Sequence, residues 1–348
     1  LAKNEDEYRF LLDNYLLGEP EEIYSKLGSE PALRAHVLAT LATGTASSRD
    51  GLMDFLNSTF FAHQTTMLGL EEAAENVLDF LMKEGMIRSE DGRLVPTFFG
   101  RRVSDLYIDP LTATKLRDAL KSFRPGGSPF GLLHAVCSSP DMLTMYLKRS
   151  DYEWVEEVYV TRESELLLPP PDDMDEFDFY LSEIKTACSI DDWVMEMEED
   201  DLLKKYGMGP GDLRNKVDVG EWLIYSMREL SNIFNKDAYP VLTELMVRIR
   251  YGVRPELLDL VRLRGVGRAR ARSLYNHGIR SAEGIREIDP VRLARLPKIG
   301  DAVAKSLLTQ VGGTLFRRDS DAVEAAVEEV KAEETRPADS KQRSLFDF

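Results

Sequence analysis

The sequence predicts a mainly α-helical protein in which a winged helix is followed by a multi-helix domain and a tandem helix-hairpin-helix domain. Apolar residues recur at helical spacing through most of the chain, two short strand-like runs interrupt them once, and a glycine-containing turn is repeated near the end. A content of 43% hydrophobic residues in 348 suffices for several buried cores. We place the domains at residues 1–108, 109–252 and 253–312, with a flexible tail at 313–348.

Residues 1–108 are predicted to form helices closed by a small hairpin. Apolar spacing and a Ser-Glu-Asp-Gly turn indicate helices at 31–43, 52–61 and 70–83, and strands at 86–88 and 93–95. This order predicts a winged helix, which either binds DNA or serves as a packing module. The segment at 52–61, which would be the recognition helix, has no basic residue of its own.

Residues 109–252 are predicted to be helical, with an interruption at 125–127 and an acidic linker around Leu168–Pro171. Residues 151–201 carry nineteen acids and two bases. Within them, Asp175-Glu176-Phe177-Asp178 imitates an acidic motif of ATPases, but no predicted strand precedes it. We therefore do not assign nucleotide binding to it.

The helix predicted at 211–234 is the most informative element of this domain. Its apolar positions form one stripe at spacings of three and four: Leu213, Val217, Gly220, Ile224, Met227, Leu230 and Phe234. Trp222 falls almost opposite the stripe, near Asn215. An outward tryptophan either packs against a neighbouring domain or offers a stacking platform to a single-stranded base. Arg214 lies about 80° from Trp222 around the helix and is placed to hold a phosphate.

A repeated turn characterises residues 253–312. Leu263-Arg264-Gly265-Val266-Gly267 is echoed 33 residues later by Leu296-Pro297-Lys298-Ile299-Gly300, and a helix follows each copy. Glycine adopts backbone angles that other residues resist, and it lets a phosphate approach the main chain. The following helix then presents free N–H groups to the anion. This pattern predicts a helix-hairpin-helix that holds a nucleic-acid backbone, with ordinary glycine-capped turns as the alternative. Because Lys298 replaces the first glycine, we expect the second hairpin to pack mainly against the first.

Basic residues gather on the same segment, although the chain as a whole has a net charge of −17. Residues 248–298 hold twelve arginines and one lysine against five acids. Such asymmetry is typical of nucleic-acid contact by the basic part, although arginines also line solvated helix faces. The predicted DNA contacts are Arg214, Asn215, Trp222, Arg262, Arg264, Gly265, Gly267, Arg268, Arg270, Arg272, Lys298 and Gly300.

The tail is charged and low in aromatic residues, which predicts flexibility. It ends with Gln342, Leu345, Phe346 and Phe348, a spacing that resembles the sliding-clamp-binding peptide of replication and repair proteins. One aromatic residue of the fullest motif is missing, and a merely adhesive terminus is the alternative.

Several classes of chemistry have no support in the sequence. Gly300 to Ser306 lacks the second glycine of a nucleotide-binding loop and lies in a predicted hairpin helix. Cys137 and Cys188 lie far apart and predict reduced, buried thiols, which fits a cytoplasmic protein. No run approaches the roughly twenty apolar residues that span a bilayer, so no membrane partner is expected. The first residues are neither a signal peptide nor a natural start, which suggests the later part of a longer protein.

The order of these elements resembles the C-terminal, non-motor half of the archaeal Hjm-type superfamily-two DNA helicases, whose metazoan relative is helicase-Q. The resemblance covers essentially the whole chain and is most specific at 209–214, 221–223 and 257–275. It implies two preceding RecA-like motor domains that bind ATP and Mg and drive 3′-to-5′ movement on single-stranded DNA. It also implies that 211–234 is a ratchet helix, with Trp222 stacking on a base and Asn215 where the family has a basic residue.

The resemblance further implies that the hairpin domain is a brake, which holds the exiting strand through Arg264, Gly265, Gly267 and Arg268. We therefore expect the DNA-gripping half of an ATP-dependent helicase of replication-fork repair and recombination, with forked or single-stranded DNA, its own motor domains and a sliding clamp as partners. This chain alone is predicted to be inactive and to hold no cofactor. The alternatives are a freestanding clamp-tethered adaptor, and a base-excision enzyme that would need a carboxylate such as Asp319 or Asp321.

Overall fold

The computed structural model describes residues 2–19 and 22–312, which fall into two compact units with their sequence boundary between Thr114 and Lys115. Helices dominate both units, and the mainly α-helical fold predicted from the sequence is confirmed. The predicted tail at 313–348, with its clamp-binding peptide, lies outside the described residues. No described helix is long and apolar enough to cross a membrane.

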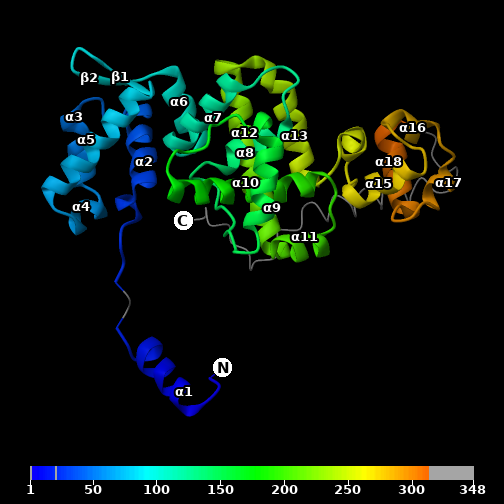
Figure 1. Ribbon diagram of the computed structural model, residues 1–348, viewed down its shortest axis with the longest axis horizontal. Coiled ribbons are helices and arrows are strands. Elements are labelled where there is room, and N and C mark those ends of the chain that lie inside the picture. The colour runs from blue at the N-terminus through cyan, green and yellow to red at the C-terminus, as the bar shows by residue number, and fades with distance from the viewer. Residues whose placement is uncertain (1, 20–21, 313–348) are drawn as a thin grey trace. The chain divides into compact units, whose positions relative to one another are not determined.

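The first unit is a helical bundle with one antiparallel hairpin at the ends of its helices (Figure 1). In the hairpin, Ile87 pairs with Pro96 and Glu90 pairs with Arg93 across a turn at Asp91 and Gly92. Helix α2 packs against α5 and α6. The elements are α1 (Glu5–Leu11), η1 (Leu12–Leu16), η2 (Lys26–Gly28), α2 (Glu30–Ala42), α3 (Arg49–Asn57), α4 (Phe60–Gln64), α5 (Met67–Lys83), β1 (Ile87–Glu90), β2 (Arg93–Pro96), α6 (Phe98–Leu106) and the first turns of α7 (Pro110–Ser122).

The prediction of one helix at 52–61 was wrong, because the chain breaks between α3 and α4. The Ser58 hydroxyl donates to the Phe55 carbonyl at 2.6 Å, and the Thr59 hydroxyl donates to the Leu56 carbonyl at 2.7 Å. Side chains of this type compete with the helical hydrogen bonds of the backbone and favour helix ends. The apolar spacing does not reveal these hydrogen bonds between side chains and the main chain, so it could not predict the break.

A buried ion pair joins the start of α2 to the start of α7 within the first unit. The Arg34 Nε and Nη2 atoms donate to both carboxylate oxygens of Asp109, at 2.9 and 2.8 Å. Both side chains are almost fully excluded from solvent. Asp109 also accepts from the Leu111 amide at 2.9 Å, so one carboxylate fixes both helix starts.

The second unit is entirely helical in its described part, and α12 runs through its middle (Figure 1). Helix α12 packs against α8, α10 and α13. Its elements after α7 are α8 (Pro129–Cys137), α9 (Tyr152–Arg162), η3 (Glu163–Glu165), α10 (Met174–Val194), α11 (Glu199–Tyr206), α12 (Pro210–Phe234), η4 (Lys236–Ala238), α13 (Tyr239–Tyr251), η5 (Pro255–Leu257), α14 (Leu258–Val261), α15 (Arg268–Asn276), α16 (Ala282–Glu287), α17 (Pro290–Ala294) and α18 (Gly300–Val311).

The apolar stripe predicted on α12 is confirmed. Leu213, Val217, Gly220, Ile224, Met227 and Leu230 are buried, and Phe234 is partly buried. Cys137 and Cys188 are free and buried as expected, and burial raises the pKa of the Cys188 thiol to about 12.

The helical pattern predicted for 109–252 continues through most of the acidic segment 151–201, which forms α9, α10 and α11. Asp175–Asp178 belongs to α10. Val155, Ile184 and Leu202 of these helices are buried in the core. Most of the acids in this segment are exposed. Within this segment, the runs at 166–173 and 195–198 are irregular.

Helices α14 to α18 form a separate small core. Its members are Val253, Leu257, Leu260, Val261, Val266, Ala271, Leu274, Ile279, Ile285, Leu293, Leu296, Ile299, Ala304, Leu307 and Leu308. Val266 and Ile299, the middle residues of the two repeated turns, are both buried in it. The two turns are therefore anchored by one apolar side chain each, and their flanking residues face outward.

Candidate nucleic-acid interface

The first hairpin turn contains two glycines whose roles differ. Gly265 has φ +77°, in the left-handed region that favours glycine. Gly267 has φ −90° and ψ −177°, an extended conformation that other residues adopt. Among the described residues, and apart from its two chain neighbours, a Cβ atom built on Gly267 would meet no atom within 4 Å. The fold therefore requires glycine at 265, whereas the protein itself leaves the space above Gly267 open.

The main-chain N–H groups of this turn are available to a ligand. Helix α15 begins at Arg268, and Gly267 caps it without a side-chain hydrogen bond. Among the described residues, no acceptor contacts the amides of Gly265 and Gly267. Both glycines are exposed. Unbonded amides and the positive end of the helix dipole together favour an anion at this position.

The second hairpin reproduces the first in backbone conformation as well as in sequence. Lys298 adopts φ +67°, close to the value of Gly265, and Gly300 adopts φ +65°. A left-handed conformation costs a non-glycine residue roughly 1–2 kcal/mol, so the fold imposes it on Lys298. Helix α18 carries Asp301 in its first turn, and this carboxylate opposes an anion there.

Hydrogen bonds fasten the two turns to each other. The Arg270 guanidinium donates to the Gly265 carbonyl at 2.6 Å and to the Lys298 carbonyl at 3.0 Å. The Ser273 hydroxyl donates to the Pro297 carbonyl at 2.7 Å. Gln310 of α18 exchanges two hydrogen bonds with the main chain of Arg264, at 2.8 and 3.1 Å. The second hairpin thus packs against the first, as its lysine suggested.

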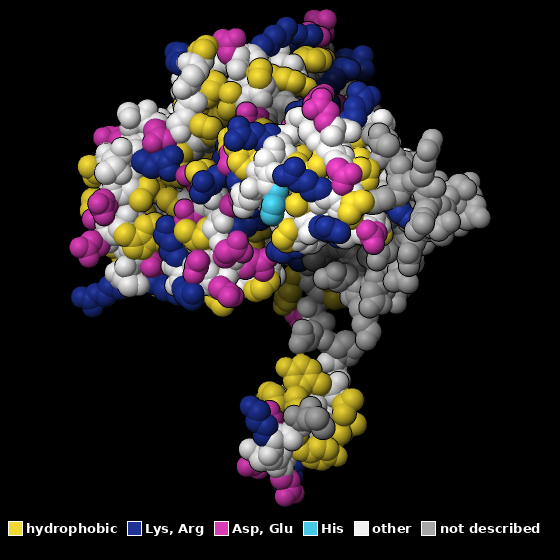
Figure 2. Space-filling view, turned by 90° about the vertical axis from the view of Figure 1, so that its right-hand side faces the viewer, with side chains coloured by type: hydrophobic (Ala, Val, Ile, Leu, Met, Phe, Trp, Pro, Cys, Tyr) yellow, Lys and Arg dark blue, Asp and Glu magenta, His cyan; other side chains and the backbone are white. Residues whose placement is uncertain are grey.

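The five arginines at the first hairpin have different surroundings in the structure: Arg262, Arg264, Arg268, Arg270 and Arg272. Arg262 and Arg264 are exposed beside the turn, as is Lys298 of the second turn. Arg270 holds the two turns together. Arg268 and Arg272 instead contact the segment between α10 and α11, so these two predicted DNA contacts already have partners within the protein. Figure 2 looks onto this side of the molecule and shows dark-blue Lys and Arg side chains interspersed with apolar ones.

Glu196, between α10 and α11, accepts hydrogen bonds from Arg268 and Arg272. Its carboxylate accepts from the Arg272 guanidinium at 2.7 and 2.6 Å, and its carbonyl accepts from Arg268. It also accepts from the Arg254 amide at 3.0 Å. Burial alone would raise the pKa of Glu196, but Arg272 and the Arg254 amide hold it below its usual value. The sequence showed an excess of acids here, yet it did not indicate which acid meets which arginine.

Arg268 also lies over the indole ring of Trp193, 5.1 Å from its centroid. The Trp193 N–H donates to the Ile249 carbonyl at 2.8 Å, and the ring fills the space beside Gly252. Trp193 and Glu196 therefore connect the hairpin domain to the helical domain through their contacts with Arg268 and Arg272. Neither residue was singled out from the sequence.

The predicted contacts on α12 form a second group. The helical spacing predicts an outward-facing Trp222. In the structure its side chain is partly exposed. Asn215 is exposed, and Arg214 makes an exposed ion pair with Asp218 at 2.9 Å. Sequence reasoning missed Arg228, whose guanidinium lies over the rings of Tyr225 and Tyr239, at 5.0 and 5.5 Å from their centroids.

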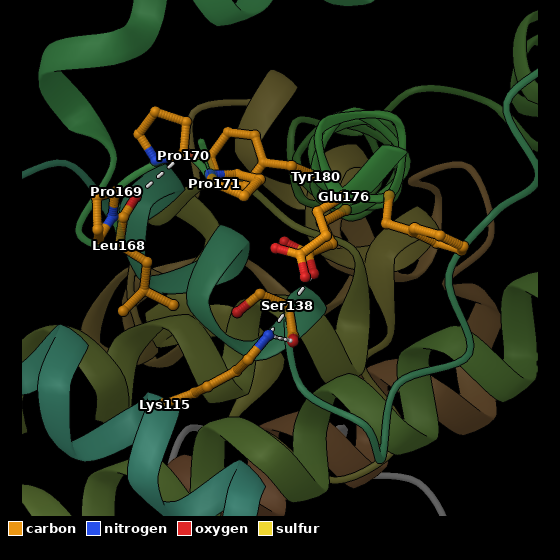
Figure 3. Close-up of a pocket in the computed structure, with 10 residues that line it drawn as sticks. Lys115, Ser138, Leu168, Pro169, Pro170, Pro171, Glu176 and Tyr180 are labelled. Carbon is orange, nitrogen blue, oxygen red and sulfur yellow. Dashed lines mark hydrogen bonds and ion pairs between the residues drawn. The ribbon is translucent and has the colours of Figure 1, made fainter. Parts of the chain in front are cut away.

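A cavity of about 550 Å³ lies at the start of α10, lined by Leu168 to Pro171 and by polar groups. Figure 3 shows the Lys115 ammonium pointing toward Ser138 and toward a carboxylate. Lys115 Nζ lies 3.8 Å from Glu183 Oε1. Burial raises the pKa of Glu183 to about 7, although Lys115 opposes the shift. His134 beneath it is fully buried, and burial, aided by Lys115, lowers its pKa to about 3.

Stability should therefore depend on pH through Glu183. Its pKa is raised in the folded state, so its contribution is fully present below about pH 4.5 and is lost as the pH rises through about 7. We expect the Glu183 contribution to the free energy of unfolding to fall by about 3 kcal/mol across this window, whereas the lowered pKa of His134 contributes a rise of opposite sign up to about pH 6.5. Denaturant titrations at a series of pH values measure this dependence.

Glu183→Gln should remove the Glu183 contribution, because the amide does not titrate, and the difference between the two pH profiles separates this contribution from that of His134. The exposed Glu153→Gln provides the matched control and should leave it unchanged. An identical pH profile for Glu183→Gln and the unsubstituted protein would contradict the prediction.

Three family profiles match the chain. One described as an archaeal helicase domain 4 matches residues 130–252, a tandem helix-hairpin-helix of the SAM-like type matches 257–311, and a helix-turn-helix domain matches 11–88. Together with the paired turns, these matches define the class as the non-motor part of an archaeal DNA helicase.

Known helicases resemble the chain along its length. It is 40% identical to the ATP-dependent DNA helicase Hel308 of Methanocella arvoryzae over 100% of this chain and 46% of that protein. It is 36% identical to Hel308 of Thermococcus kodakarensis over 90% of this chain and 28% of that protein. It is 31% identical to Hel308 of Pyrococcus horikoshii over 90% of this chain and 44% of that protein. The chain belongs to the Hel308 DNA helicases and corresponds to their C-terminal half, as the sequence resemblance predicted. It spans less than half the length of these relatives.

Proposed function

We propose that this chain is the single-strand-gripping, non-motor half of an ATP-dependent helicase that moves 3′ to 5′ on forked or single-stranded DNA during replication-fork repair and recombination. The unbonded amides of Gly265 and Gly267 at the uncapped start of α15 carry the proposal. A sugar–phosphate backbone suits this site, because main-chain donors and a helix N-terminus contact phosphate without reading bases. The exposed Arg262 adds positive charge beside it.

Helix α12 supplies a second contact in this proposal. The partly exposed indole of Trp222 stacks on a base as the strand advances, and Asn215 lies on the exposed surface of the same helix. The ion pair between Arg214 and Asp218 is exposed, and such pairs contribute little to stability. Arg214 can therefore exchange Asp218 for a phosphate at little cost.

ATP and Mg belong to motor domains in this proposal, and we assign no step of hydrolysis to the residues described. Gly300 to Ser306 forms the start of α18 rather than a phosphate loop after a strand. The described residues contain no group of His, Cys, Asp and Glu suited to a metal ion. The proposed sliding-clamp contact rests on Gln342, Leu345, Phe346 and Phe348 of the tail. Similarity to helicases along the chain supports this function over a freestanding adaptor.

The salt dependence of DNA binding tests the proposal. We expect the logarithm of the affinity for an oligo-dT strand to fall linearly with the logarithm of the salt concentration, by about 0.7 per phosphate contact. Fluorescence anisotropy of the labelled strand, measured at several salt concentrations, gives this slope. An affinity that does not change with salt would exclude the phosphate contacts proposed at the hairpin.

Trp222→Ala tests the base contact in the same assay. We expect it to weaken binding by roughly 1–3 kcal/mol, the range for one stacked base. Trp222→Phe should recover part of this loss because an aromatic face remains. If the affinity stays unchanged while the melting temperature falls, Trp222 is a packing residue instead.

A further inference from the structure

The loop between α8 and α9 is held from beneath by two buried lysines. Lys185 Nζ donates to the Tyr146 carbonyl at 2.8 Å, and Lys216 Nζ donates to the Leu143 carbonyl. Lys185 is 1% exposed and Lys216 is 7% exposed. The Thr186 hydroxyl accepts from the Met145 amide at 2.8 Å. The backbone at 143–146 is therefore fixed at three successive points.

The same loop presents large apolar side chains to solvent. Tyr146 is 82% exposed and Leu143 is 77% exposed, whereas Met142 and Leu147 at the two ends of the loop are buried. Burying two ammonium groups costs free energy, even when each finds an acceptor. The result of this arrangement is an aromatic ring on a rigid backbone that faces solvent.

A positively charged cavity of about 250 Å³ lies beside Tyr146. Lys148, Lys185 and Lys216 line it, with Asp212 as the one carboxylate in its lining. That carboxylate is engaged, since it accepts from the Gly209 amide at 3.2 Å. Asp151 beneath the loop is paired with Lys185 at 2.6 Å. Positive charge therefore remains in excess around the cavity.

Hydrogen-bonding capacity also remains there. Lys216 Nζ has one described acceptor, the Leu143 carbonyl, although an ammonium group has three N–H donors. Lys148 Nζ lies 3.1 Å from the place that a Cβ on Gly207 would occupy, so the glycine leaves room for this ammonium at the cavity wall. Burial lowers the pKa of Lys216, and an anion beside it would reverse this shift.

We propose that this cavity binds a phosphate group and that Tyr146 stacks on the base attached to that phosphate. The site would be a further contact for a single strand of nucleic acid, and in naming a strand as the source it rests on the proposed function. Lys216 lies six residues before Trp222 on α12, about 9 Å along the helix and about 120° around it. The cavity is therefore a contact separate from the one proposed for Trp222.

Variants of exposed side chains test the site without removing the buried lysines. Lys148 contributes its main-chain N–H and carbonyl to Asp151, both at 2.8 Å, and Lys148→Ala keeps these bonds. Tyr146→Ala removes the ring, and Tyr146→Phe retains it. Lys236→Ala, on η4 at the far end of α12, is the control for losing an exposed lysine.

Anisotropy with labelled oligo-dT should show about tenfold weaker binding for Tyr146→Ala and near-normal binding for Tyr146→Phe. Lys148→Ala should reduce the slope of log affinity against log salt by about 0.7, the value for one phosphate contact, and Lys236→Ala should leave it unchanged. Melting temperatures of all four variants should match that of the unsubstituted protein.

Two results would overturn the inference. If Tyr146→Ala and Lys148→Ala bind oligo-dT normally while Trp222→Ala binds weakly, the cavity is no strand contact and the proposed function stands. If thymidine monophosphate competes as strongly as oligo-dT of equal nucleotide concentration, the pocket takes a free nucleotide rather than a strand. A chain that binds no strand at any salt concentration instead contradicts the proposed function itself.

Discussion

Asp109→Ala should lower the free energy of unfolding of the first unit by about 3–5 kcal/mol, the range for removing one partner of a buried ion pair. Arg34 would keep its guanidinium in the core with Glu30 as its one other described acid partner, and Glu30 is exposed. The substitution also removes the acceptor for the Leu111 amide. Urea titration of the full chain, with hydrogen exchange of α2 and α5 as a local readout, measures the loss.

Glu5→Ala is the matched control, because it removes an exposed ion pair with Arg9 at 2.9 Å in the same unit. Exposed pairs contribute roughly 0–1 kcal/mol, so this variant should unfold almost like the unsubstituted protein. The double variant Arg34→Met with Asp109→Leu should be more stable than Asp109→Ala, because it leaves no charge unpaired. A loss below about 1 kcal/mol for Asp109→Ala would show that water reaches Arg34 easily.

Gly267→Asp should weaken binding of oligo-dT about tenfold to a hundredfold, with little change in stability. Its backbone is extended, and its Cβ would meet no atom within 4 Å in the described part of the chain apart from its two neighbours, so the fold accepts the side chain. The carboxylate would occupy the space of the phosphate and accept from the helix N–H groups itself. A charge-assisted hydrogen bond contributes about 1.5–3 kcal/mol, which sets the size of the expected effect.

Gly265→Ala provides the contrasting variant in the same turn. Its φ of +77° strains any other residue, so we expect destabilisation by roughly 1–2 kcal/mol. Anisotropy and thermal unfolding of the two variants separate the roles of the glycines. Normal DNA binding by a folded Gly267→Asp would show that the strand does not approach these amides.

The repeated turn and the α12 stripe illustrate what the sequence could predict. Both depend on local rules: glycine at a left-handed position, and apolar residues on one side of a helix. The helix at 52–61 failed because Ser58 and Thr59 form side-chain bonds that end α3, and periodicity does not measure such bonds. The acidic linker was expected to include Asp175–Asp178, but these residues belong to α10.

The candidate site shows a similar division. Gly265, Gly267 and Arg262 lie exposed around one turn, where the sequence placed them. Arg268 and Arg272 follow within five residues of Gly267, yet they contact Glu196 from a distant segment. The cavity at Tyr146 had no signal in the sequence, because its lysines come from the α8–α9 loop, α10 and α12.

The sequence by itself determined the mainly helical class, the two hairpin turns and the family, because each depends on residues that lie close together along the chain. Only the tertiary structure decided which charges remain available to a ligand. Arg272 is paired with Glu196, whereas Lys216 Nζ, beside a cavity, has the Leu143 carbonyl as its one acceptor among the described residues. Charges act through space over a few ångströms, so the partner of each one depends on which segments the fold brings together.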